Sequence, residues 1–292
     1  MRVFVTGASG FVGSAVVKEL IDAGHAVTGL ARSDANAAAL TAMGAQPHRG
    51  SLEDLESLRA GAKAADGVIH CAFNHDFTRF VENCELDRHA IEALGDGLAG
   101  SGKPLIVTSG SALLAPGQLA TEDQQAGTHI PRVSEQAGDA LLARGVKAMM
   151  MRLPPSVHGD GDHGFVPRLI GFAREKGKAA YVGDGANRWP AVHRLDAAVL
   201  YRLVLEKGQA GARYHAIGDE GVPFRQIARV IGEKLGVPQV SLSKQEAEAH
   251  FGWFALFAGI DAPASGDKTK AAMDWRPRHV GLIADLEKGT YF

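Results

Sequence analysis

Apolar and polar positions follow two alternating periods along the first half of the chain. Short, mostly apolar runs are typical of strands buried in a parallel sheet, and they occur at 3–5, 26–30, 68–72, 105–108 and 148–153. The segments between them carry apolar residues every three or four positions, which predicts amphipathic helices at about 11–23, 35–43, 76–98 and 133–143. A short strand near 46–48 precedes a helix from Ser51, where Ser51 and Asp54 have capping-box-like spacing. This alternation predicts an α/β fold.

Right-handed crossovers between such strands give a Rossmann-type doubly wound parallel sheet, with helices on both faces and a ligand crevice at the carboxyl ends of the strands. After Pro154-Pro155 the rhythm changes to helices near 165–176, 196–206 and 224–235, with short strands around 180–182 and 213–216. We therefore expect a dinucleotide-binding domain over 1–160 and a smaller, C-terminal substrate lobe over 161–292 that packs on it. A capping box at Ser243 and Glu246 precedes four aromatic residues: Phe251, Trp253, Phe254 and Phe257. We expect most of them in the core of the smaller lobe and one or two of them in a lid over the substrate.

The composition of the chain bears on its binding partners and says little about the reaction. With 46% hydrophobic and 22% charged residues and a net charge of −2, the chain has no bulk attraction to nucleic acid or to an anionic membrane. Its most apolar stretch, 251–260, is too short to span a bilayer. Cys71 and Cys84, its two cysteines, lie in segments predicted to be buried. Because the first strand also follows Met1 almost directly, we expect a cytoplasmic protein with a small-molecule substrate.

Three glycines spaced three apart follow the first strand, in Thr6-Gly7-Ala8-Ser9-Gly10-Phe11-Val12-Gly13. Gly7 permits a tight turn, Gly10 lets the backbone approach a ligand, and Gly13 lets the next helix pack closely on the sheet. The N-terminus of that helix directs unpaired N–H groups at an anion. This context predicts a dinucleotide site.

The glycine loop resembles the T-G-x-x-G-x-x-G loop of the extended and atypical short-chain dehydrogenases/reductases, the epimerase/dehydratase-like branch. Further landmarks resemble that family in the same order: Gly50-Ser51-Leu52 with Asp54, Val68 to Ala72, Leu153 to Gly159, Val182 to Gly185 and His193 to Asp196. The resemblance covers nearly the whole chain. Together with the glycine loop it implies that these residues bind the cofactor: Gly7, Ser9, Gly10, Phe11, Val12, Gly13, Arg32, Ser33, Ser51, Leu52, Cys71, Ala72, Phe73, Ser109, Leu153, Pro155 and Val157.

The residues at the end of the second strand indicate which cofactor, NAD or NADP, the chain selects. Members of the family that select NAD place an acidic residue there, whereas this chain has Ala31 followed by Arg32. A guanidinium can bind a 2′-phosphate through two parallel hydrogen bonds. We therefore expect NADP, with NAD as the alternative and a solvated loop charge as the other interpretation of Arg32.

The family's catalytic Tyr-x-x-x-Lys pair is missing. Four residues after Tyr181, Tyr201 and Tyr214 stand Gly185, Leu205 and Gly218, and Tyr291 is too close to the end of the chain. By register, Pro131 takes the place of the tyrosine and Glu135 that of the lysine. The family's usual mechanism is therefore not carried over.

Other groups become candidates for catalysis. Ser109 or Ser111 could polarise a carbonyl, and His158, which replaces the tyrosine of the V-Y-G turn, could hold a proton. A turn-capping or purely structural role is the alternative for each. The spacing of His158, Asp160 and His163 matches no common zinc pattern, so we expect no metal. The substrate pocket is expected to include His75, Tyr181, Trp189 and His193.

These observations favour an NADP-dependent oxidoreductase that acts on a small carbonyl or alcohol. Loss of the Tyr-Lys pair leaves a non-catalytic NADP-binding sensor as the alternative, and the family branch leaves a nucleotide-sugar-type epimerase or dehydratase. The long helices over 76–98 and 133–143 resemble those that pair in relatives, so a homodimer is consistent with the sequence.

Overall fold

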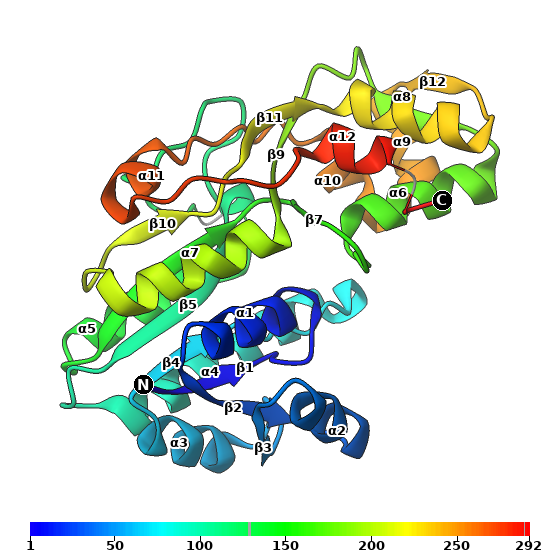
Figure 1. The fold of residues 1–292 in the computed structure, drawn as a ribbon. Helices are drawn as coiled ribbons and strands as arrows, with labels where there is room; N and C mark the ends of the chain where they lie inside the picture. The colour runs from blue at the N-terminus through cyan, green and yellow to red at the C-terminus, as the bar shows by residue number, and fades with distance from the viewer. Residues whose placement is uncertain (128–129, 289) are drawn as a thin grey trace.

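A seven-stranded parallel sheet organises the first layer of the computed structural model, which describes residues 1–127, 130–288 and 290–292 (Figure 1). The strand order is β10-β6-β5-β4-β1-β2-β3, so the order reverses between β1 and β4, where a doubly wound sheet opens its crevice. The strands are β1 (Arg2–Thr6), β2 (Ala26–Ala31), β3 (Gln46–Arg49), β4 (Gly67–His70), β5 (Pro104–Gly110), β6 (Lys147–Leu153) and β10 (Arg213–His215).

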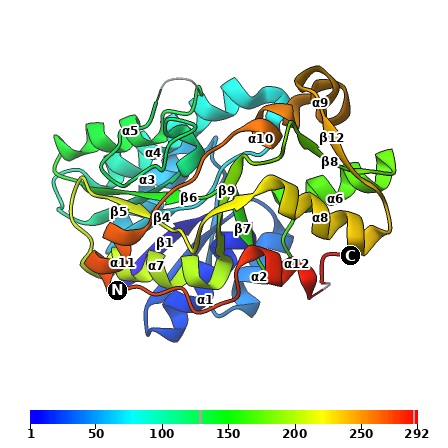
Figure 2. The same ribbon diagram turned by 90° about the horizontal axis from the view of Figure 1, so that it is seen from above.

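Helices cover both faces of this sheet, which confirms the predicted fold class (Figure 2). One face packs on α1 (Phe11–Asp22), α2 (Asp34–Ala42) and α7 (Arg194–Lys207). The other packs on α3 (Leu55–Ala64), α4 (Phe80–Leu98) and α5 (Ser134–Leu142). The apolar strands predicted from the sequence are buried on both faces for this reason.

A smaller lobe has its own apolar core beside the carboxyl edge of the sheet. It contains a three-stranded sheet of β7 (Ser156–His158), β9 (Arg188–His193) and β11 (Asp219–Pro223), and a parallel pair of β8 (Ala179–Val182) and β12 (Gln239–Leu242). Its helices are α6 (Phe165–Lys176), α8 (Phe224–Leu235), α9 (Lys244–Phe251), α10 (Ala255–Gly259) and α12 (Leu282–Glu287).

The two layers are interleaved along the chain. After residue 160 the chain forms α6 and β8, but α7 then returns to pack against α1, and β10 joins β6 at the edge of the large sheet. α11 (Asp267–Met273) also packs on α7. A boundary at 160 therefore assigns α7, β10 and α11 to the smaller lobe, although they complete the large layer.

Two helices start later than predicted, because a local cap sets each start further along the chain than the pattern indicates. α3 begins at Leu55 instead of Ser51, since Asp54 accepts a hydrogen bond from the Ser57 backbone nitrogen. The helix predicted from Asp76 begins as the 3₁₀ turn η1 (Phe77–Arg79), capped by Asp76, and α4 follows it. The capping box at the start of α9 is present as predicted.

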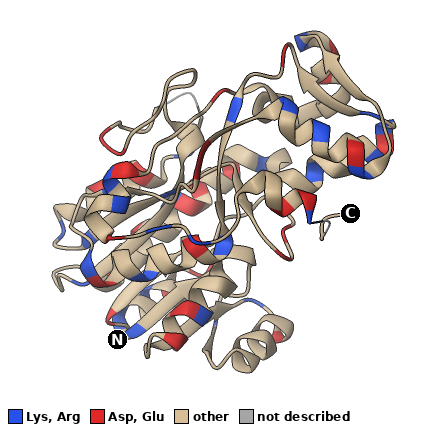
Figure 3. Cartoon of the chain, turned by 45° about the horizontal axis from the view of Figure 1, so that its top comes forward, with Lys and Arg blue, Asp and Glu red and all other residues tan. Residues whose placement is uncertain are grey.

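Lys and Arg alternate with Asp and Glu on the visible helices and loops, without a field of one sign (Figure 3). Within the described part of the chain, no helix is both long enough and apolar enough to cross a membrane.

Candidate dinucleotide and active site

The turn between β1 and α1 has the shape that its three glycines predict. Gly7 has a φ of +65°, and a Cβ there would lie 2.8 Å from the backbone nitrogen of Ala72. A Cβ at Gly13 would lie 2.0 Å from the Gly7 carbonyl oxygen, so only glycine lets the helix start this close to the turn. At Gly10 a Cβ would meet only that same oxygen, at 3.1 Å, which leaves this side open. The loop is a cradle that only glycines can form at Gly7 and Gly13 and that stays open at Gly10, and its form fits a pyrophosphate.

α1 begins at this cradle without a side chain to satisfy its N-terminus. Its N-cap is Gly10, and its first turn contains no acidic residue. Unpaired N–H groups and the positive end of the helix dipole favour an anion at such a terminus. The charge distribution at the start of α1 and the shape of the loop therefore both favour a bound anion.

The end of β2 presents an exposed cation close to the glycine loop. Ala31 is buried there and Arg32 is exposed, without a carboxylate partner among the described residues. Ser33 caps α2 by accepting from the backbone nitrogen of Asn36, whose side chain donates to Ser9 Oγ at 2.9 Å. This bridge holds the turn after β2 against the glycine loop. No sequence signal indicated this role for Asn36, because Asn36 and Ser9 are 27 residues apart.

The remaining predicted cofactor positions lie at strand ends along the same edge. Cys71, Ala72 and Phe73 follow β4 and are half-buried, and burial raises the pKa of the Cys71 thiol to about 12, so it stays protonated. From Leu153, the last residue of β6, to Val157 every second residue is partly exposed. That series contains Leu153, Pro155 and Val157, while Ser51 and Leu52 are half-buried after β3. Their contact with a cofactor stays a prediction.

Glu135, at the register position of the family's lysine, is a buried structural carboxylate. It pairs with the fully buried Arg152 through two contacts of 2.7 Å and accepts a further bond from Arg213 at 3.1 Å. Burial raises the pKa of Glu135, but the bonds and charge of Arg152 outweigh it and hold the pKa below its ordinary value. Pro131 precedes α5. The charge reversal is therefore compensated inside the protein.

The two candidate serines after β5 differ in their partners. Ser109 is buried and donates to Glu135 at 2.9 Å, which commits its hydroxyl proton to that carboxylate. Ser111 is also buried, and its Oγ has no hydrogen-bond partner within the described residues. A catalytic role for either serine stays a prediction.

A buried polar chain that sequence reasoning missed runs from the glycine loop to the start of α5. Thr6 Oγ1 contacts His70 Nδ1 at 2.7 Å, and His70 Nε2 contacts Asp87 at 3.1 Å. Asp87 accepts from Ser134, which in turn accepts from Arg132 Nε at 2.8 Å. Only the tertiary fold aligns these residues, which come from four elements.

Arg132 is the last residue of this series of hydrogen bonds and lies beside the strand ends. Its guanidinium stacks over Phe73 at 4.2 Å from the ring centre and donates to the Thr108 carbonyl oxygen. Its side chain is 16% exposed. A cation therefore stands beside the strand ends of β4 and β5, one residue from the position of the family's tyrosine.

His158 lies behind the crevice instead of in it. It is 1% exposed, and its Nδ1 donates to Asp285 at 2.9 Å, which leaves Nε2 without a partner among the described residues. Burial lowers its pKa in spite of Asp285, so the imidazole is neutral near pH 7. A buried, neutral His158 cannot touch a substrate in this arrangement. Burial also raises the pKa of the neighbouring Asp162 to about 6.

His193, Asp196 and His279 place three potential metal ligands within 4.8 Å of one another. The Asp196 carboxylate already accepts from the backbone nitrogens of Arg278 and His279 and from His279 Nδ1. The rings of His193 and His279 stack at 4.4 Å. Through these contacts the three residues hold the segment around His279 against the start of α7, which gives the cluster a structural role.

The four predicted substrate residues lie in different surroundings. Trp189 is completely buried in the smaller lobe, where its Nε1 donates to the Phe257 carbonyl oxygen, so it is a core residue and not the wall of an open pocket. Tyr181 is half-buried in β8, within the same lobe. His75 is exposed beside Phe73 after β4, and His193 caps α7.

An aromatic cluster joins the crevice edge to the smaller lobe. Phe77 of η1 stacks on Trp253 at 4.6 Å and also contacts Phe165 and Phe257. Phe254, like Phe251, is buried in the core, whereas Trp253 is 43% exposed. Of the four aromatic residues predicted as core or lid, Trp253 has the exposure of a lid.

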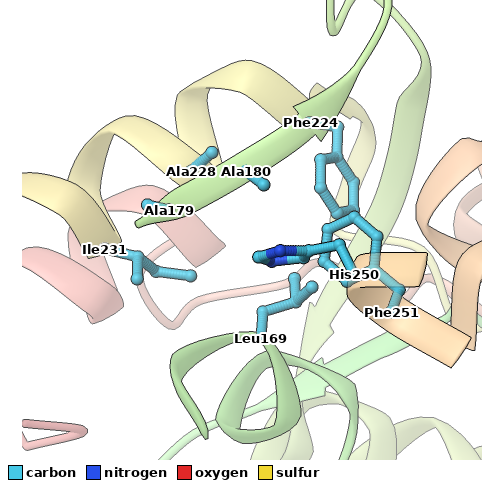
Figure 4. Close-up of a pocket in the computed structure, with 8 residues that line it drawn as sticks. All are labelled: Leu169, Ala179, Ala180, Phe224, Ala228, Ile231, His250 and Phe251. Atoms are coloured by element: carbon cyan, nitrogen blue, oxygen red, sulfur yellow. The ribbon is translucent and has the colours of Figure 1, made fainter. Parts of the chain in front are cut away.

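An internal cavity of about 10 Å³ lies within the smaller lobe and away from this crevice (Figure 4). Its size is close to that of one water. Apolar side chains of α6, β8 and α8 surround the ring of His250, whose Nε2 has no partner within the described chain. Burial lowers the pKa of His250. The cavity has no chemistry that points to catalysis.

The fold and the glycine cradle define a Rossmann-type dinucleotide-binding protein of the extended short-chain dehydrogenase/reductase kind. A model of the NAD dependent epimerase/dehydratase family matches residues 3–217. An uncharacterized protein of Schizosaccharomyces pombe is 48% identical over the full length of both chains. The chain belongs to the NAD dependent epimerase/dehydratase family.

Two further proteins are similar to it. A sterol-4-alpha-carboxylate 3-dehydrogenase of Dictyostelium discoideum is 29% identical over 81% of this chain and 77% of its own. The crystal structure of DesIV, a dTDP-glucose 4,6-dehydratase of Streptomyces venezuelae with NAD bound, has a TM-score of 0.80 at 21% identity and covers 99% of this chain and 96% of its own. The similarity to DesIV, at 21% identity, is a similarity of fold.

Proposed function

We propose that this protein is an NADP-dependent oxidoreductase that transfers a hydride to or from a small carbonyl compound or alcohol. The nicotinamide supplies the hydride chemistry when bound, and the chain has to bind it, orient it and exclude water. The turn of Gly7, Gly10 and Gly13 supports dinucleotide binding, because Gly7 and Gly13 allow the tight turn and the close helix start, and Gly10 leaves the side toward a ligand open. The similarity to a dehydrogenase supports redox chemistry.

The observation that carries the choice of NADP is the pair at the end of β2. A buried Ala31 cannot accept hydrogen bonds from ribose hydroxyls, and the exposed Arg32 has no carboxylate of the described chain to neutralise it. A 2′-phosphate beside Arg32 would provide that partner.

One observation favours a second candidate, an NADP-binding sensor without turnover. The hydroxyl of Ser109 is bound to Glu135, and Glu135 is committed to Arg152. The positions that carry proton transfer in relatives are therefore occupied by a structural ion pair. An epimerase or dehydratase has less support here, since those reactions usually also rely on the missing tyrosine.

Cofactor binding tests the assignment of Arg32 directly. Titration with NADPH and NADH, followed by cofactor fluorescence, should show tighter binding of NADPH by the native protein. Arg32→Asp should weaken NADPH roughly 10- to 100-fold and change NADH by less than about threefold, because only the 2′-phosphate loses a charged hydrogen bond. Arg168→Asp makes the same charge change on the exposed face of α6 and should leave both affinities unchanged. Equal loss of NADPH and NADH in the Arg32 variant contradicts the assignment.

Turnover separates the enzyme from the sensor. The protein should oxidise NADPH in the presence of at least one member of a panel of aldehydes, ketones and quinones. Tight NADPH binding without oxidation by any of them would favour the sensor.

A further inference from the structure

Helices α1 and α7 run parallel and in register on one face of the large sheet. Arg202 of α7 pairs with Glu19 of α1 at 2.6 Å, and Glu206 pairs with His25 just beyond the end of α1 at 3.0 Å. At the other end, the Arg194 guanidinium lies 4.9 Å from the ring centre of Phe11. The N-termini of both helices therefore meet beside the glycine loop.

Arg194 differs from the other basic residues along this seam. Arg202 and His25 each have a carboxylate partner, whereas half-buried Arg194 has none among the described residues. Phe11, on which it lies, directly follows Gly10 of the cradle. The cation is thus held at the edge of the proposed pyrophosphate site by a ring of the loop itself.

Two helix N-termini and one cation meet at this position, which favours an anion there. Arg194 is the first residue of α7, at the positive end of the helix dipole, which the His193 cap and Asp196 in the first turn offset only in part. The uncapped N-terminus of α1 adds a second positive helix end nearby. A dinucleotide pyrophosphate would neutralise all three at once.

The loop between β7 and α6 covers the same place from the smaller lobe. A Cβ at Gly161, which has a φ of +82°, would lie 3.9 Å from Arg194 Nη1. The ring of His163 contacts Phe11 edge-on at 5.7 Å. Arg194 therefore lies between this loop and Phe11.

We infer that Arg194 binds the pyrophosphate of the cofactor, opposite the backbone N–H groups of the glycine loop. The inference rests on the proposed function, because it needs a dinucleotide in the cradle. It assigns separate phosphates to the two arginines: Arg32 selects the 2′-phosphate, and Arg194 holds the diphosphate that NADPH and NADH share.

Arg194→Met tests this, since methionine keeps an apolar contact with Phe11 and removes the charge. Calorimetric titration should show NADPH, NADH and ADP each weakened roughly 10- to 100-fold, the loss of a charged hydrogen bond, while adenosine 2′-monophosphate changes less than about twofold. Arg194→Lys should recover part of the loss. Arg202→Met, eight residues along the same helix, is the matched control and should leave all four affinities unchanged.

Thermal unfolding separates ligand binding from a structural role. Without ligand, Arg194→Met should unfold at the native temperature or slightly above it, because a cation has left a helix N-terminus; with NADPH its stabilisation should be smaller than that of the native protein. A lower unfolding temperature without ligand, or an unchanged affinity for NADH and ADP, overturns the inference. If the native protein binds neither NADPH nor NADH, the proposed function fails, and the assignment of Arg194 fails with it.

Discussion

His193 illustrates how one side chain at the junction of the two layers is kept uncharged. It caps α7 through Nδ1, stacks on His279 and meets the edge of the His158 ring at 5.4 Å. Burial first, and then the two neighbouring imidazoles, lower its pKa to about 4, although Asp196 and Asp285 act in the opposite direction. At neutral pH the His193 ring is therefore uncharged.

This arrangement predicts an acid-sensitive contribution to stability. The unfolded chain takes up a proton on this histidine near pH 6.5, whereas the folded chain does so only near pH 4, so stability is lost as the pH falls between these values. His193→Asn keeps a helix cap and removes the titration. Urea unfolding should show the native protein losing about 1 kcal/mol more than the variant between pH 7 and pH 4.5, a value reduced for partial exposure. Parallel pH profiles would contradict the prediction. Because Asp162 titrates in both proteins, it cancels in the comparison.

At the scale of elements, the ion pair of Glu135 and Arg152 joins the start of α5 to β6. Both side chains are almost completely buried, and Arg213 of β10 adds a second cation. A carboxylate at this position therefore fastens α5 to two strands at the edge of the sheet. The family's lysine at this register position would put a third positive charge against two arginines.

Replacing that carboxylate should destabilise the fold. Glu135→Gln leaves Arg152 as a buried charge without its counterion and should lower the free energy of unfolding by about 3 kcal/mol. Asp139→Asn is the matched control on the same helix, because Asp139 pairs with Arg213 but is 37% exposed; it should cost about 0.5 kcal/mol. Urea titrations measure both values. A loss in Glu135→Gln no larger than that of the control would show that the buried pair contributes little.

Elements were predictable from sequence wherever local rules decide them. α6 and α8 were predicted at their observed bounds because amphipathic periodicity and a glycine in the left-handed conformation at the C-cap of each are local signals. α3 and α4 start later than predicted, because Asp54 caps one helix and a 3₁₀ turn precedes the other. The return of α7 and β10 to the large sheet is a tertiary feature that no local pattern carries.

The same distinction applies to the site. The glycine loop was predictable because backbone geometry demands glycine at fixed spacing. Asn36, Arg132 and Arg194 were missed as site residues because their significance depends on partners distant in sequence: Ser9, Phe73 and Phe11. Trp189 was placed in the pocket because it lies between Tyr181 and His193 in the sequence, and burial assigns it to the core.

For the whole molecule, the crevice depends on how the smaller lobe is held against the sheet. Phe77 follows β4 in the large layer, while Trp253 and Phe257 belong to the smaller lobe. Their rings form an aromatic bridge across the crevice side, and the stack of Phe77 on Trp253 is nearly parallel at 13°. The bridge lies at the surface, so it can separate without unfolding either core.

Trp253 reports on this bridge because the other two tryptophans, Trp189 and Trp275, are buried. Phe77→Ala removes the stacked ring and should increase acrylamide quenching of the fluorescence, and aromatic pairing worth about 1 kcal/mol should be lost in urea unfolding. Val81→Ala is a nearby control at an exposed position and should change neither property. In Trp253→Phe the quenchable component should disappear, which identifies its source. If Phe77→Ala leaves quenching unchanged, the two layers are held together without this bridge. If quenching rises and the affinity for NADPH also falls, the bridge keeps the crevice closed around its ligand.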